Sequence, residues 1–362
     1  MKGVLFLLSS LAKRKVSRRD FMKACAAMAV YLGLSESFAP KIADAVENAS
    51  KKTPVIWLEG QDCAGCSEAF LNLTEPTPAQ IILDTISLKY HETVMFGTGY
   101  LADKALDEAL KAGNYVLVVE GSIPTADPMF CTAGTMSDTN PARRPVVETL
   151  KEAYKKASVV IALGSCASWG GVVQDTPSKG RGVSDIVGKE KVINLPMCPC
   201  NPDHLVGTLV YYLTFKKAPP LDIHQRPLMF FGTLIHDNCP RRGHFERGEF
   251  VTNYGDPNQA EYCLYLKGCK GPFTFSDCPS RGFNDNVNWC IKASAPCAGC
   301  SQPEFYAGFS PLYEKSNDVN LPGIGGVPSE TVGTVAAAVT ALGVAAHLVG
   351  RSVFGKKKEG DK

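Results

Sequence analysis

The sequence predicts an α/β protein in which a parallel-sheet domain is followed by an irregular, cysteine-rich domain and a C-terminal transmembrane helix. Three observations lead to this prediction. Apolar runs alternate with helical patterns over residues 53–222. Seven of the fourteen cysteines then lie between His236 and Cys300, where helical and strand periodicity is nearly absent. Residues 331–350 carry no charged side chain.

The N-terminal part reads as alternating strands and helices. Buried strands are predicted at 55–58, 115–119, 158–163 and 191–195, and a Gly or Pro follows each of them within two residues. Helical patterns occupy 67–73, 101–112 and 145–157. Asn201 before Pro202 predicts the start of a further helix, because Asn caps helices well and Pro fits the first helical position. Alternation of this kind makes a parallel sheet flanked by helices.

Cysteines follow three of these predicted strands. Cys63 and Cys66 come after the first strand, Cys166 after the third, and Cys198 and Cys200 after the fourth. In open α/β sheets, ligands bind beyond the carboxyl ends of the strands. Four thiols from three loops at one edge therefore predict a single four-thiolate site, with Cys200 as an alternative to Cys198.

The irregular segment has little apolar material for a core of its own. Soft thiolates on irregular backbone select zinc, copper(I) or iron–sulfur clusters. One His and seven Cys supply eight ligands, enough for two further four-ligand sites. These residues are His236, Cys239, Cys263, Cys269, Cys278, Cys290, Cys297 and Cys300.

Both ends of the chain carry targeting signals. Residues 1–45 read as a twin-arginine export signal, with Arg18 and Arg19 before a weakly apolar stretch and a possible cleavage site at residues 43–45. This route exports proteins already folded, which suits a chain that takes up metal first. The predicted membrane span at 331–350 follows a linker at 316–330.

The basic tail at 351–362 marks the cytoplasmic side of the predicted span. The body of the protein is therefore expected on the periplasmic side of the cell membrane. The net charge of +2 gives no global field that favours nucleic acid, so no nucleic-acid partner is expected.

Six motifs within roughly residues 53 to 310 contain most of the cysteines described above. They are Cys63-Ala-Gly-Cys66-Ser-Glu68, Gly164-Ser-Cys166-Ala, Cys198-Pro-x-Asn201-Pro202-Asp203, His236-x-x-Cys239-x-Arg241-Arg242, Cys263-Leu-Tyr-Leu-Lys-Gly-Cys269-Lys-Gly-Pro272 and Pro296-Cys297-x-Gly-Cys300-Ser. Each is weak alone, but together they are specific, and they resemble the motifs of the small subunit of membrane-bound, periplasm-facing nickel–iron uptake hydrogenases.

The resemblance implies a flavodoxin-like domain at 53–222, a cluster-bearing domain at 223–315 and three iron–sulfur clusters. It assigns the proximal 4Fe–4S cluster to Cys63, Cys66, Cys166 and Cys198. The distal 4Fe–4S cluster is assigned to His236, Cys239, Cys263 and Cys269, and the medial cluster to Cys278, Cys297 and Cys300.

Cys290 departs from the pattern of the resembling family. Many members carry Pro at this place, after Asn-Trp, and hold a three-iron medial cluster. Here Asn288-Trp289-Cys290 supplies a fourth thiolate, so we expect a 4Fe–4S medial cluster, or 3Fe–4S if Cys290 is not a ligand. Added thiolate charge lowers the reduction potential of a cluster.

The resemblance implies an electron-transferring subunit of an oxidoreductase that oxidises H2 reversibly. Electrons would pass between the nickel–iron site of a separate large subunit and a membrane cytochrome b or another acceptor. No residue of this chain is expected to be catalytic, and activity would require the large subunit. The alternatives are a free ferredoxin-like carrier, the quinone-linked single-cluster subunit of respiratory complexes, and a structural zinc protein.

Overall fold

The computed structural model describes residues 53–95, 97–133, 144–315, 319–321, 325–327 and 329–354, with short runs between 19 and 43. The chain divides into two compact units, Met1–Glu314 and Lys315–Lys362, each described here by itself. The predicted export signal at 1–45 lies largely outside the described residues. Parts of the predicted linker at 316–330 and tail at 351–362 lie outside them too.

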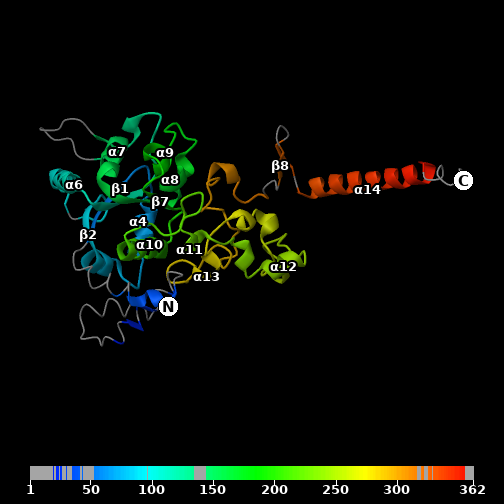
Figure 1. Cartoon of the computed structure of the whole chain (residues 1–362), viewed down its shortest axis with the longest axis horizontal. Coiled ribbons are helices and arrows are strands. Elements are labelled where there is room, and N and C mark those ends of the chain that lie inside the picture. The colour runs from blue at the N-terminus through cyan, green and yellow to red at the C-terminus, as the bar shows by residue number, and fades with distance from the viewer. Residues whose placement is uncertain are drawn as a thin grey trace, which may run out of the picture. The chain divides into compact units, whose positions relative to one another are not determined.

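A five-stranded parallel sheet forms the centre of the first unit (Figure 1). Its strand order, β2-β1-β3-β6-β7, is the doubly wound order that places ligands beyond the carboxyl ends of the strands. The strands are β1 (Thr53–Glu59), β2 (Ile86–His91), β3 (Tyr115–Glu120), β6 (Ala157–Leu163) and β7 (Val192–Leu195). Four of them coincide with predicted strands. The edge strand β2 was missed, because Ser87 and Lys89 interrupt its apolar run.

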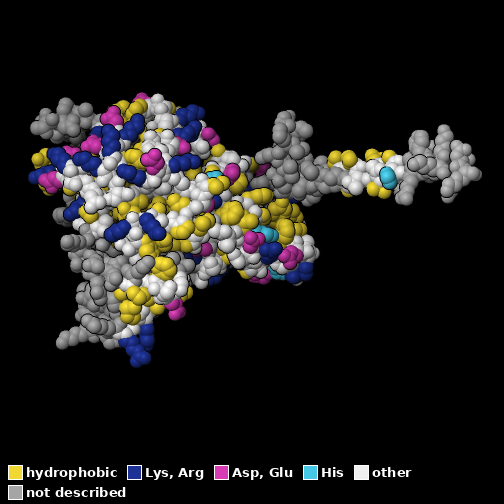
Figure 2. All heavy atoms as spheres, in the orientation of Figure 1, with side chains coloured by type: hydrophobic (Ala, Val, Ile, Leu, Met, Phe, Trp, Pro, Cys, Tyr) yellow, Lys and Arg dark blue, Asp and Glu magenta, His cyan; other side chains and the backbone are white. Residues whose placement is uncertain are grey.

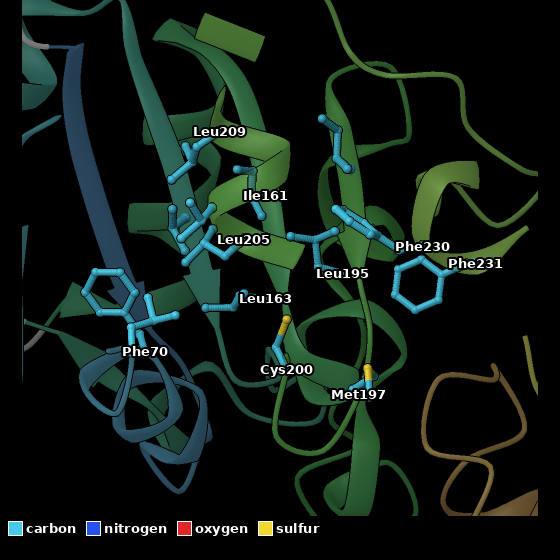
Figure 3. Packing of buried hydrophobic residues seen from close by; sticks show 14 of the residues in the cluster. Phe70, Ile161, Leu163, Leu195, Met197, Cys200, Leu205, Leu209, Phe230 and Phe231 are labelled. Carbon is cyan, nitrogen blue, oxygen red and sulfur yellow. The ribbon is translucent and has the colours of Figure 1, made fainter. Parts of the chain in front are cut away.

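Helices cover both faces of the sheet (Figure 1). Val55 and Trp57 of β1 share one apolar core with residues of α4 (Gly65–Leu71) and α10 (Pro202–Phe215). Ile56 and Leu58 share the other core with residues of α6 (Tyr100–Ala112) and α7 (Val146–Lys156). Adjacent strand residues therefore point to opposite faces, as pleating requires. Figure 3 shows the first core, where Leu205 and Leu209 of α10 lie beside residues of β6.

The cysteine-rich part of the first unit contains only short helices, among them α11 (Leu228–Phe231), α12 (Arg242–Glu246) and α13 (Cys278–Arg281). It shares a core with the sheet, since Phe230 and Phe231 belong to the same apolar cluster as Leu195 (Figure 3). His204 of α10 stacks on Phe230 with ring centroids 4.3 Å apart. Among the described residues, the remaining α-helices and β-strands of this unit are α5 (Pro78–Gln80), β4 (Thr132–Ala133), β5 (Arg144–Pro145), α8 (Gly164–Trp169) and α9 (Val183–Val187).

The second unit corrects the prediction of a transmembrane helix. It holds β8 (Val319–Leu321) paired with β9 (Gly325–Val327), and α14 (Ser329–Phe354). None of the described helices combines the length and the apolar character needed to cross a membrane. The prediction rested on the absence of charge over 331–350, but many of those residues are Ala, Gly or Thr. Such small side chains bring little apolar surface, and His347 is polar.

Candidate functional site

The first cysteine group consists of Cys63, Cys66, Cys166 and Cys198. Cys63 and Cys66 lie at the start of α4 after β1, Cys166 lies in α8 after β6, and Cys198 follows β7. Burial raises the pKa of the Cys166 thiol to about 12, and the neighbouring Cys198 and Cys63 contribute to this shift. Burial also raises the pKa of Cys66, and the neighbouring Cys200, Glu120 and Cys166 contribute to this shift in that order. The four sulfurs therefore converge at the carboxyl edge of the sheet, where thiolates need a cation to neutralise them.

Two glycines allow the backbone to approach these sulfurs. A Cβ on Gly164 would lie 2.6 Å from the Sγ of Cys66, and one on Gly171 would lie 2.6 Å from the Sγ of Cys166. Both glycines also have positive φ angles, +84° and +56°. Any larger residue at either position would have a strained backbone, and its side chain would collide with a cysteine sulfur. Glycine therefore leaves the space around these sulfurs free.

Cys200 lies beside this group, and its thiol raises the pKa of Cys66 more than the thiol of Cys166 does. It is 1% exposed and belongs to the apolar core, where Figure 3 shows it near Leu163. Its Sγ donates to the carbonyl oxygen of Asn201 (3.4 Å), while its backbone N–H donates to the Sγ of Cys66 (3.3 Å). This arrangement favours Cys198 over Cys200 as the fourth ligand.

A buried carboxylate holds the start of α4 in place. Glu120, at the end of β3, is 2% exposed. Its Oε1 accepts from the backbone N–H groups of Cys66 (2.9 Å) and Ser67 (3.2 Å). Its Oε2 accepts from the Ser67 hydroxyl (2.6 Å) and from Nε1 of Trp57 (3.1 Å). Sequence reasoning missed this residue, although an acid at the carboxyl end of a buried strand is a usable signal.

We expect Glu120→Ala to lower the free energy of unfolding by about 3 kcal/mol or more. The reason is that it leaves several buried donors without a partner, each costing about 1–3 kcal/mol. Glu108→Ala is the matched control, because Glu108 is an exposed acid of α6 that only pairs with Lys104 at 3.9 Å. Urea denaturation of the purified protein measures both. Equal midpoints for the two variants would contradict the prediction.

His91 extends this hydrogen-bonded chain. Its Nδ1 accepts from the backbone N–H groups of Thr93 (3.2 Å) and Val94 (3.3 Å), and its Nε2 lies 3.3 Å from the Ser67 hydroxyl. The proton therefore sits on Nε2, and the 3.4 Å separation of Nδ1 from Glu59 is not an ion pair. Burial lowers the pKa of His91 to about 4.

This lowered pKa predicts a loss of stability in mild acid. The unfolded chain takes up the His91 proton near pH 6.5, whereas the folded chain does so only near pH 4. Stability should therefore fall as the pH falls through this window, by up to about 3 kcal/mol from His91. His91→Gln should flatten the dependence of the urea midpoint on pH between these values. Parallel curves for the parent and the variant would show that His91 contributes nothing.

The second cysteine group consists of Cys278, Cys290, Cys297 and Cys300. Burial raises the pKa of Cys278, and Cys297 and Cys290 contribute to the shift. Burial likewise raises the pKa of Cys300, and the neighbouring Cys278 and Cys290 raise it further. The structure thus brings the exposed Cys290 to the other three cysteines of this group.

The third group consists of His236, Cys239, Cys263 and Cys269, which line one pocket. The backbone N–H groups of Gly271 and Cys297 both donate to the Sγ of Cys269, each at 3.4 Å. Burial raises the pKa of Cys269 to about 11 and lowers that of His236. The imidazole is thus held in the neutral form that binds metal.

The three groups are adjacent to one another. The backbone N–H of Cys198 bonds to the sulfur of Cys300, and the Ser165 hydroxyl donates to the Cys300 carbonyl oxygen, which links the first and second groups. Cys297 of the second group donates its backbone N–H to Cys269 of the third. The second group therefore lies between the other two.

The donor sets fit iron–sulfur clusters. The eleven cysteines of the three groups form no disulfide, and most of them are buried or half-buried. Thiolates with one imidazole, and backbone N–H groups aimed at the sulfurs, are the ligands and tuning contacts of such clusters.

Comparison with known families divides the chain into two matching parts. A model of the C-terminal region of NiFe/NiFeSe hydrogenase small subunits matches residues 231–313. A model described as "NADH ubiquinone oxidoreductase, 20 Kd subunit" matches residues 63–212. The hydrogenase match covers the cysteine-rich part, which the single-cluster respiratory alternative was expected to lack.

Whole-chain relatives agree with this division. The chain is 44% identical over 310 residues to the periplasmic NiFe hydrogenase small subunit of Solidesulfovibrio fructosivorans, covering 84% of this chain and 95% of the relative. It is 39% identical over 360 residues to the quinone-reactive Ni/Fe-hydrogenase small chain of Wolinella succinogenes, covering 96% and 99%. The solved Ni-Fe-Se hydrogenase of Desulfomicrobium baculatum matches with a TM-score of 0.68 and 36% identity, covering 73% and 99%.

Proposed function

The chain belongs to the family of nickel–iron hydrogenase small subunits, which relay electrons from the large-subunit site, and we propose that its three cysteine groups hold three iron–sulfur clusters. The first group corresponds to the proximal 4Fe–4S cluster, the second to a medial 4Fe–4S cluster and the third to the distal 4Fe–4S cluster. The observation that carries this proposal is the contact of the second group with each of the others.

Iron–sulfur clusters supply one-electron redox chemistry when bound. The residues of this chain bind and orient them and keep water away. Cys263, Cys278 and Cys297 are buried, whereas Cys290 at the edge of the second group is exposed. Cys63 and Cys198 are exposed, so the first group is open at the edge of the sheet, where the large subunit would cover it.

A free ferredoxin-like carrier is not the function, because the relatives are small subunits of hydrogenases. Figure 2 is consistent with a partner chain. Apolar side chains gather over the cysteine-rich part of the face shown, whereas charged side chains gather over α6 and α7. Contiguous exposed apolar surface marks protein contacts.

Co-purification tests this function. We expect a nickel-containing partner chain in equal amount, H2-dependent dye reduction by the complex, and none by this chain alone. A monomer that carries iron and sulfide without such a partner would contradict the proposal.

We also propose that residues 1–45 direct export by the twin-arginine route to the periplasmic side, where a cytochrome b or another acceptor receives the electrons. The periplasmic relative supports this location. Cell fractionation tests it: replacing Arg18 and Arg19 by Lys should leave the protein in the cytoplasm, and unchanged export would overturn the assignment.

Cys290 decides the type of medial cluster. We expect Cys290→Ser to produce a three-iron paramagnetic signal in the oxidised complex that the parent lacks, because only three thiolates remain. Cys131→Ser is the control, since Cys131 is half-buried outside the three groups. A strong three-iron signal in the parent complex would show that Cys290 is not a ligand.

A further inference from the structure

Lys270 is a buried lysine between two of the cysteine groups. It is 1% exposed, although lysine is almost never fully buried unless it is paired. It directly follows Cys269 of the third group, and its backbone N–H donates to the carbonyl oxygen of Cys297 in the second group (2.7 Å). The Cβ of Lys270 also packs against Gly299, which lies between Cys297 and Cys300: a Cβ added to Gly299 would lie 3.2 Å from it.

The side chain is held in one place. Its Nζ donates to the carbonyl oxygen of Glu314 (2.6 Å), and the backbone carbonyl oxygen of Lys270 accepts from the Thr274 hydroxyl (2.6 Å). Within the described part of the chain, no carboxylate forms an ion pair with Nζ. The nearby carboxylate of Glu314 is exposed, and it raises the pKa of the Lys270 ammonium, which burial lowers.

The positive charges of the other buried basic residues have different hydrogen-bonding partners. Among the described residues, Arg226 and Arg241 are the other buried Lys or Arg side chains. Arg226 pairs with Asp222 at 2.7 Å, so its charge is offset locally. Arg241 donates to the carbonyl oxygen of Tyr262 (2.9 Å) and the hydroxyl of Ser294 (2.9 Å), beside the third group. The first group instead has the buried carboxylate of Glu120.

We propose that the buried ammonium of Lys270 raises the reduction potentials of the medial and distal clusters relative to the proximal one. The inference rests on the function proposed above. Each cluster gains one electron when it is reduced, and a fixed positive charge in a low-dielectric interior stabilises the reduced form. Lys270 neither binds nor releases a proton in this step. Electrons are therefore drawn away from the large subunit, which favours H2 oxidation over proton reduction.

Redox titration of the assembled complex, followed by paramagnetic resonance, tests the proposal. Lys270→Met removes the charge at similar length, and Lys270→Arg keeps it. The Met variant should shift the medial and distal potentials downward and leave the proximal potential in place, whereas the Arg variant should stay near the parent. In the Met variant, the ratio of H2 oxidation to proton reduction should fall as well. Unmoved potentials, or an equal shift of all three, would overturn the inference.

Two further variants complete the test. Lys292→Met is the matched control, because Lys292 is an exposed lysine two residues from Cys290 whose charge is screened by water and salt. Lys270→Gln is a second neutral variant that can still donate to the carbonyl oxygen of Glu314, and it should lower the medial and distal potentials as Lys270→Met does. It carries the test if Lys270→Met does not assemble, and unmoved potentials would then count against the proposal. A parent complex without iron–sulfur clusters would instead refute the proposed function.

Discussion

Replacing Cys166 with Ser should lower H2-dependent dye reduction by the assembled complex at least about a hundredfold. Loss of a residue that merely supports a metal ligand already costs about 10–100-fold, and Cys166 is proposed as a ligand of the proximal cluster. Its sulfur lies among those of Cys63, Cys66 and Cys198, and it is the one thiol that α8 contributes to this group.

Cys131→Ser is the matched control for this prediction. Cys131 is also a half-buried thiol of the sheet domain, and burial raises its pKa to about 11, yet it lies outside the three groups. Its replacement should leave dye reduction near the parent rate. Isotope exchange between H2 and D2O needs only the large-subunit site. It should therefore persist in both variants, provided that they still co-purify with the partner. A fully active Cys166→Ser complex would remove Cys166 from the proximal set.

The second large effect is expected at the other end of the relay. His236→Ala should lower electron transfer to an external acceptor at least about tenfold, while exchange at the large-subunit site continues. His236 lines the pocket of the third group, the proposed distal site, and is half-buried. Removing its imidazole opens the distal site to water and deprives it of its one neutral ligand.

His244→Ala is the control for this experiment. His244 lies eight residues along the same segment, as the sequence shows, but its Nδ1 is 2.6 Å from Glu249. It should change acceptor reduction little. If the two variants lose activity equally, the loss reflects the surface of this segment and not a distal ligand.

The sequence predicted the features that depend on local pattern. Four strands were visible as apolar runs. The rule that ligands bind at the carboxyl ends of strands then predicted one site from Cys63, Cys166 and Cys198. Cys63 and Cys198 neighbour Cys166 in the structure, and their binding of one cluster stays a prediction. The edge strand β2 was hidden because an edge strand needs fewer apolar residues.

Features that join distant segments were not predictable in the same way. The chain of contacts from His91 through Ser67 to Glu120 links β2, α4 and β3, and no spacing in the sequence records it. Lys270 looks like any other lysine until the fold buries it. The transmembrane prediction was wrong because an uncharged run is not necessarily an apolar one.

Metal and sulfide analysis of the co-purified complex, combined with paramagnetic resonance, tests whether the three cysteine groups hold three iron–sulfur clusters. We expect about twelve iron atoms for this chain, as three four-iron clusters require, together with signals from three interacting clusters. Zinc in place of iron, or about four iron atoms in a single cluster, would contradict this expectation.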